Sequence, residues 1–291
     1  MPPTLRNVMT ATATAVASVA ALALTAPATH AADTTLDYVA LGDSYSAGSG
    51  VLPVDLSSPL CLRSTANYPK VLASRTGARL TDVTCGAAQT KDFTESQYPG
   101  VAPQIEAVGQ DTDLVTLTIG GNDNNTFVGA MLACGTAGLV SGGQGSPCKT
   151  LYGSSFDDKI DSHTYPALRA ALGKVRAAAP NARLAVLGYP WIVPATADPS
   201  CFLKLPIASG DVPYLRALQA HLNAVVERAA VESGATYVDF ARTSDGHDAC
   251  KASGTRWVEP LLFGRNVVPV HPNALGESRM AEQTMGTLGL G

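Results

Sequence analysis

Four short segments contain residues whose types suit the transfer of an acyl group. Ser44 lies in GDSYSAG, Gly86 in TCGAAQT, Asn122 in GGND and His271 in VPVHPN. A serine hydroxyl becomes a nucleophile when a base removes its proton, and histidine titrates in the range that suits such a base. Backbone N–H groups and an amide can hold the oxyanion that forms on the substrate carbonyl. We therefore predict Ser44 as nucleophile and His271 as base, with an oxyanion hole made by the N–H groups of Ser44 and Gly86 and the Asn122 side chain.

Apolar runs with strand character precede the first three of these segments, and helical patterns separate the runs. A parallel sheet covered on both faces is the fold that such alternation favours, and the run LVTLTI reads as one of its buried strands. Ligands of these sheets bind beyond the carboxyl ends of the strands, which is where the serine, glycine and asparagine stand. We predict five strands within residues 36–42, 79–85, 113–123, 182–190 and 235–240, and helices within 65–77, 102–109, 162–180, 213–234 and 274–288.

Two long stretches, residues 126–157 and 191–211, lack a clear periodic pattern and are expected to be loops of the same domain. We see no internal repeat and no charged linker. The sequence therefore predicts one domain over residues 32–291, preceded by a separate leader.

The leader, residues 1–31, has the features of a secretory signal peptide. Arg6 precedes a small-residue apolar run at 11–26, and PATHAAD follows with alanines that suit cleavage near residues 28–32. The alternative is a membrane anchor, but the run is short and rich in Ala and Thr, whereas a spanning helix needs about 20 strongly apolar residues. The sequence predicts a secreted, extracellular protein without stable membrane insertion.

The composition excludes several classes of protein. The chain has 24 acidic and 20 basic residues, for a formal net charge of −4, and no Lys/Arg cluster, so nucleic-acid partners are not expected. With 46% hydrophobic residues the chain can bury a substantial core. The Gly48–Gly50 segment is not followed by Gly-Lys-Ser/Thr, which argues against a phosphate loop. We expect no cofactor and no metal, and a monomer that binds a small-molecule or lipid ester.

Six cysteines all lie after the predicted leader, and an even number in a secreted chain favours three disulfides. Their spacing is not the paired C-x-x-C of a zinc site. Six cysteines allow 15 pairings. Among them we predict the sequential one: Cys61–Cys85, Cys134–Cys148 and Cys201–Cys250.

Taken in order, the four segments resemble the four blocks of the SGNH (GDSL) hydrolase family. GDSYSAG is similar to the first block, Gly86 matches the glycine of the second, GGND the third, and VPVHPN the last. The disulfide-bearing loops and the run before GGND look most like secreted lipases and esterases of actinobacteria. The resemblance implies a flavodoxin-like three-layer α/β/α sandwich with a five-stranded parallel sheet. It also implies the same roles for Ser44, Gly86, Asn122 and His271.

The last block departs from the family pattern, Asp-x-x-His, because Val268 stands three residues before His271. Some secreted relatives are understood to orient the histidine with a backbone carbonyl, and we predict that the Val268 carbonyl does so here in a Ser–His dyad. Asp245 and Asp248 are the rival acids. His247 is the rival base.

These observations predict a carboxylic ester hydrolase, a lipase or esterase acting on lipid and acyl esters. The alternatives are a carbohydrate O-acetylesterase, a phospholipase and, outside enzymes, a secreted binding domain in which Ser44 is only a turn residue.

Overall fold

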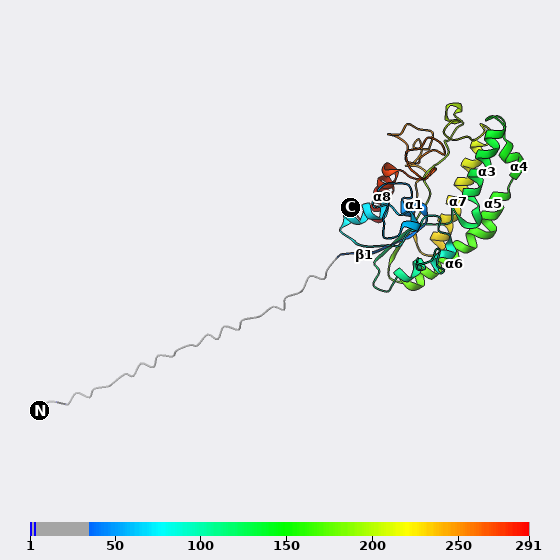
Figure 1. Cartoon of the computed structure of the whole chain (residues 1–291). Helices are drawn as coiled ribbons and strands as arrows, with labels where there is room; N and C mark the ends of the chain where they lie inside the picture. The colour runs from blue at the N-terminus through cyan, green and yellow to red at the C-terminus, as the bar shows by residue number, and fades with distance from the viewer. Residues whose placement is uncertain (2, 4–34, 291) are drawn as a thin grey trace. The chain divides into compact units, whose positions relative to one another are not determined.

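The protein is described by a computed structural model that covers residues 1, 3 and 35–290. Five parallel strands form one sheet with helices on both sides (Figure 1). The strand order is β2-β1-β3-β4-β5, which is the flavodoxin-like order. Gly42 pairs with Thr118, so β1 and β3 end at the same level. The strand bounds are β1 Asp37–Gly42, β2 Arg79–Asp82, β3 Leu114–Thr118, β4 Arg183–Leu187 and β5 Thr236–Val238.

Helices cover both faces of this sheet. On one face α2 packs against α8, and on the other α6 packs against α7. The predicted three-layer α/β/α fold is confirmed. The helix bounds are α1 Ser44–Ala47, α2 Tyr68–Thr76, α3 Phe127–Val140, α4 Pro147–Tyr152, α5 Ser155–Lys159, α6 Tyr165–Ala178, α7 Val212–Glu232 and α8 Ala274–Leu288, and shorter turns include η2 Thr90–Phe93, η3 Gln104–Ala107, η4 Asp123–Asn125 and the π-helical turn η5 Ile160–Thr164.

The closing helix, α8, begins and ends at residues that the sequence marks clearly. The Asn273 side chain accepts a hydrogen bond from the Gly276 N–H (3.0 Å) and caps the N-terminus. Gly289, with φ of 63°, ends the helix in the left-handed conformation. The capping residue Asn273 lies only two residues after His271, and so it anchors the segment that carries the histidine.

The expectation of a loop over residues 126–157 is wrong, because most of this stretch folds as α3, α4 and the start of α5. Its glycines suggested irregular chain, yet in α3 they serve close packing. A Cβ atom on Gly138 would lie 2.1 Å from the Pro206 carbonyl oxygen, so glycine lets α3 lie directly against the backbone of the 203–206 segment. The other stretch, 191–211, is irregular as expected apart from the turn η6 Pro199–Cys201.

Three disulfides link Cys61 to Cys85, Cys134 to Cys148 and Cys201 to Cys250, which is the sequential pairing. Apart from Met1 and Pro3, the predicted signal peptide, residues 1–31, lies outside the described residues. Within the part of the chain that the structure describes, none of the helices combines the length and apolar character needed to cross a bilayer.

Candidate active site

Ser44 and His271 meet at the carboxyl edge of the sheet, although 227 positions separate them in the sequence. Ser44 is the first residue of α1, directly after the end of β1, and its side chain is largely buried. The Oγ atom of Ser44 lies 2.7 Å from Nε2 of His271, which is hydrogen-bonding distance. In this geometry the imidazole can take the proton of the hydroxyl as the oxygen attacks a carbonyl carbon.

The other ring nitrogen of His271 faces a backbone carbonyl, but not the one that we predicted. Nδ1 lies 2.7 Å from the carbonyl oxygen of Pro269, so the Val268 prediction is corrected by one residue. Val270 has a left-handed backbone, with φ of 54°, and this turn brings the carbonyl two residues before the histidine, rather than three, onto the ring. Desolvation lowers the pKa of His271, and the bond to Pro269 partly opposes that shift.

The rival acids and the rival histidine are engaged elsewhere. Asp245 pairs with Arg216 (2.8 Å), and Asp248 accepts the N–H of Cys250 (3.0 Å). His247 stacks on Trp257 and has Nδ1 2.6 Å from the Thr255 carbonyl. These three side chains therefore lie outside the site that Ser44 and His271 form. His247 instead lines a separate cavity of about 590 Å³ beside α8.

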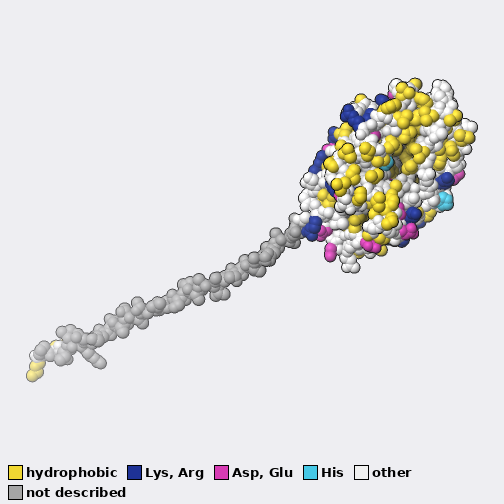
Figure 2. Space-filling view, viewed as in Figure 1, with side chains coloured by type: hydrophobic (Ala, Val, Ile, Leu, Met, Phe, Trp, Pro, Cys, Tyr) yellow, Lys and Arg dark blue, Asp and Glu magenta, His cyan; other side chains and the backbone are white. Residues whose placement is uncertain are grey.

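An apolar pocket of about 220 Å³ opens beside the serine and histidine. The face of the molecule seen in Figure 2 gathers many hydrophobic side chains around a hollow. Helix α3 and the segment before His271 supply most of the apolar lining: Phe127, Val128, Met131, Leu132, Ile192, Leu261, Val268 and Val270. Such walls can hold a hydrocarbon chain while its carboxyl end lies at the serine.

Asp43 and Tyr189 hold the start of α1 against the neighbouring strands. The buried Asp43 carboxylate accepts hydrogen bonds from the Tyr45 N–H (3.0 Å), the Thr118 hydroxyl (2.7 Å) and the Tyr189 hydroxyl (2.5 Å). Burial raises the pKa of Asp43 to about 6, although these bonds oppose the shift. The Tyr189 hydroxyl also accepts the Gly121 N–H (2.9 Å). One phenol oxygen thus links the residue before Ser44 to the residue before Asn122.

Tyr45 supports the histidine from the other side. Its hydroxyl donates a 2.7 Å bond to the Val270 carbonyl, and its ring lies 5.2 Å from the His271 ring. The Glu259 N–H donates to the His271 carbonyl (2.9 Å). Backbone and ring contacts therefore fix the histidine without a carboxylate.

The Gly86 N–H makes a backbone hydrogen bond that the sequence did not indicate. This group donates to the Cys61 carbonyl at 2.7 Å, so it is not free to hold an oxyanion, and the prediction for Gly86 is corrected. The next residue, Ala87, is exposed and left-handed (φ 63°), and its N–H meets no acceptor among the residues that the structure describes. The unengaged backbone N–H of this loop is therefore that of Ala87 and not that of Gly86.

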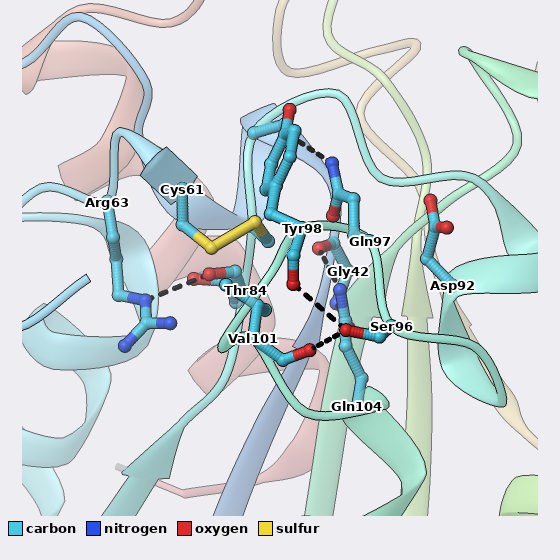
Figure 3. The surroundings of a disulfide bond; sticks show 12 residues. Gly42, Cys61, Arg63, Thr84, Asp92, Ser96, Gln97, Tyr98, Val101 and Gln104 are labelled. Carbon is cyan, nitrogen blue, oxygen red and sulfur yellow. Dashed lines mark hydrogen bonds between the residues drawn. A yellow bond between two sulfur atoms is a disulfide. The ribbon is translucent and has the colours of Figure 1, made fainter. Parts of the chain in front are cut away.

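A disulfide and a glutamine hold this loop in place. A disulfide joins Cys61 to Cys85 (Figure 3). The side-chain amide of Gln97 donates to the Gly86 carbonyl at 2.7 Å. On the other side, Arg63 Nε donates to the Thr84 carbonyl at 2.9 Å. The backbone on both sides of Gly86 is thus fixed, which gives the neighbouring Ala87 N–H a defined direction.

Asn122 follows β3 and lies against the same loop. One of its two amide hydrogens goes to the Ala88 carbonyl (3.0 Å), which leaves the second for a ligand. The adjacent Asp123 accepts both the N–H and the hydroxyl of Thr90 (2.9 Å each). Burial raises the pKa of Asp123 to about 6. Its role is to join the loop after β2 to the loop after β3.

Sequence reasoning missed Tyr189, which lines the pocket and contacts the residues before Ser44 and Asn122, and it missed the unengaged N–H of Ala87. Tyr189 follows β4 in the segment GYP, so the rule that chemistry gathers at strand ends could have identified it. Ala87 had no such signal, because a positive φ at alanine is rare and is set by the surrounding chain.

A serine–histidine pair beside an apolar pocket, at the carboxyl edge of a flavodoxin-like sheet, is the arrangement of a serine hydrolase. Residues 40–279 match the model of the GDSL-like Lipase/Acylhydrolase family, and the chain belongs to this family of ester hydrolases. It is 72% identical to Lipase 2 of Streptomyces coelicolor over 99% of each chain.

Two solved structures share the fold across nearly their whole length. A phospholipase A1 from Streptomyces albidoflavus has a TM-score of 0.71 and 29% identity, over 88% of this chain and 98% of that one. An extracellular lipase from Streptomyces rimosus has a TM-score of 0.68 and 31% identity, over 88% of this chain and 99% of that one.

Proposed function

We propose that this chain is a secreted lipase or esterase that cleaves lipid acyl esters with a Ser44–His271 dyad. The observation that carries the proposal is the 2.7 Å contact between Ser44 Oγ and His271 Nε2 at the mouth of an apolar pocket. Every group of the site comes from one chain, so a monomer suffices for the chemistry.

In the first half of the reaction, Ser44 Oγ attacks the ester carbonyl carbon while His271 Nε2 takes the hydroxyl proton. The carbonyl oxygen becomes an oxyanion, which the N–H groups of Ser44 and Ala87 and the free amide hydrogen of Asn122 can hold. The intermediate collapses when the carbon–oxygen bond to the alcohol breaks. His271 gives its proton to the departing alkoxide oxygen, and the acyl group remains on Ser44.

In the second half, a water molecule gives a proton to His271 and its oxygen attacks the acyl carbon. Collapse of the second intermediate releases the carboxylic acid, and the proton returns from His271 to Ser44. The Pro269 carbonyl accepts the Nδ1 hydrogen throughout, so it selects the tautomer with a free Nε2 lone pair. A carbonyl dipole stabilises the imidazolium less than a carboxylate would, and the lowered pKa of His271 is consistent with such a base.

The pocket favours an acyl chain over a sugar. Its walls are almost wholly apolar side chains, whereas a carbohydrate O-acetylesterase has to satisfy several hydroxyl groups. A phospholipase remains within the same chemistry, and the fold shared with a phospholipase A1 supports it as the second candidate. Secretion is supported by the leader-like sequence, by the three disulfides and by the extracellular relative from Streptomyces rimosus.

The test is hydrolysis of a panel of esters with acyl chains from C2 to C18, with phospholipids included. Ser44→Ala should lower turnover by about 10³-fold or more and abolish labelling by a serine-reactive phosphonate. Asp245→Asn and Asp248→Asn are the controls for the dyad and should retain activity. Turnover that survives in Ser44→Ala would assign another nucleophile, and a strict preference for acetyl would favour the sugar esterase.

A further inference from the structure

Large apolar side chains stand exposed on α3, whose first half lines the pocket, and on the 203–206 and 261–268 segments that lie beside this helix. We call this set the apolar rim and define it as Leu132, Leu139, Val140, Leu203, Phe263 and Val267. Phe263 is 83% exposed and Val140 86% exposed, so water covers nearly the whole of both side chains. Single exposed apolar residues are ordinary, but a cluster around a binding site marks an interaction surface.

The three segments that carry the rim contact one another. Leu132 lies on α3 and also lines the pocket. Leu261, from the 261–268 segment, packs over Gly135 of α3. The Leu262 N–H donates to the Lys204 carbonyl (2.9 Å). Gly138 lies against the Pro206 carbonyl. Helix α3, the 203–206 segment and the 261–268 segment are therefore neighbours, and the rim is continuous with the pocket wall.

The net charge of the segments that carry the rim is positive, whereas the net charge of the whole chain is negative. The chain carries a net charge of −4, yet residues 126–148 contain no charged residue. Residues 201–210 and 260–273 contain Lys204 and Arg265 and no acid. The acids that directly border these ranges, Asp211 and Glu259, are buried, and Glu259 is paired with Arg256. The exposed Asp198 interacts with Lys204 at one margin, but the rim segments themselves contain no carboxylate. An apolar surface bordered by Lys204 and Arg265 suits the surface of a phospholipid aggregate, where acyl chains lie below phosphate groups.

We propose that the apolar rim binds the surface of a phospholipid aggregate and holds the pocket mouth against it. Phe263 and Val140 enter the acyl layer, while Lys204 and Arg265 lie at the level of the headgroups. Lipid chains then reach Ser44 without crossing water. This proposal rests on the proposed function, because the pocket gives the rim its purpose.

The test separates binding from catalysis. Binding is measured by co-sedimentation with phosphatidylcholine vesicles that contain phosphatidylglycerol, in the Ser44→Ala background so that no lipid is consumed. The variant combines Val140→Gln with Phe263→Asn, since asparagine tolerates the left-handed backbone at residue 263 (φ 59°). We expect vesicle affinity to fall about a hundredfold, because the loss of apolar burial costs roughly a factor of ten for each of the two side chains.

The matched control is Val231→Ser, which removes a 64% exposed valine near the C-terminus of α7, just before β5 and so at the opposite edge of the sheet. It should bind vesicles like the parent. When Ser44 is retained, the protein with both Val140→Gln and Phe263→Asn should still hydrolyse a water-soluble acetyl ester, since neither changed residue lines the pocket.

Two outcomes would overturn the proposal. One is equal vesicle binding by the double variant and the Val231→Ser control. The other is a parent protein that sediments as a dimer and becomes a monomer in the double variant, because the rim would then be covered by a second copy. If the unmodified protein, with Ser44 in place, failed to hydrolyse the soluble ester, that result would instead count against the proposed function.

Discussion

The most informative single substitution is Tyr189→Phe, which removes one oxygen atom from the centre of the site. This hydroxyl donates to Asp43 (2.5 Å) and accepts from the Gly121 N–H (2.9 Å). Phenylalanine fills the same volume and supplies neither bond. The side chain of Tyr189 is 3% exposed, so water does not readily replace the lost oxygen. The substitution therefore leaves a buried N–H and a buried carboxylate oxygen without this partner.

The size of the effect follows from those two groups. An unsatisfied buried donor or acceptor costs about 1–3 kcal/mol, and Asp43 keeps two of its three donors, so we expect a loss of roughly 2–4 kcal/mol in the free energy of unfolding. In a domain of this size that corresponds to a fall of roughly 5–15 °C in Tm. Because the hydroxyl positions the residues before Ser44 and Asn122, kcat should also fall, by about tenfold.

Tyr38→Phe is the matched control. Its hydroxyl lies 2.5 Å from the Thr116 hydroxyl, is equally buried and stands on β1, away from the catalytic edge. Thermal unfolding and turnover of a soluble ester are measured for both variants. The control should lose stability and keep its kcat. If Tyr189→Phe lost stability and kept the kcat of the control, the tyrosine would have no positioning role. An unchanged Tm would show that the two bonds contribute nothing.

Three further predictions concern the oxyanion hole and the base. Gly86→Ala places a Cβ atom 2.9 Å from the Cys61 carbonyl oxygen and should shift the loop, with about a tenfold loss of kcat. Ala87→Gly keeps the backbone N–H and should be fully active, so equal activity of the two variants would assign the oxyanion donor elsewhere. Asn122→Ala should lower kcat by about 10²–10³-fold with little change in KM, and a change confined to KM would refute its role. The lowered pKa of His271 keeps the ring neutral as the pH falls, so the acid limb of kcat/KM should have its midpoint below pH 6.5, the ordinary pKa of histidine. A midpoint above pH 6.5 would mean that a nearby acid stabilises the protonated ring.

Much of the fold and the identity of the central pair could be predicted from the sequence. Apolar runs that alternate with helical patterns specify a parallel sheet, and a parallel sheet places the ends of its strands along one edge. Ser44 and Asn122 follow β1 and β3, which end at the same level, so their nearness is a consequence of the pattern. The cap at Asn273 likewise marks where the last helix begins and hence where His271 stands.

Only the tertiary structure decided which backbone N–H is available as an oxyanion donor and which backbone carbonyl orients His271. The Gly86 N–H is engaged by the Cys61 carbonyl, which lies 25 residues earlier, and this is why we propose the unengaged N–H of Ala87 as the donor. The left-handed turn at Val270 turns the Pro269 carbonyl onto His271 in place of the Val268 carbonyl. Side-chain types and their periodicity are written in the sequence, but every residue other than proline has an N–H and a carbonyl. Their partners depend on φ and on segments that only the folded chain brings together.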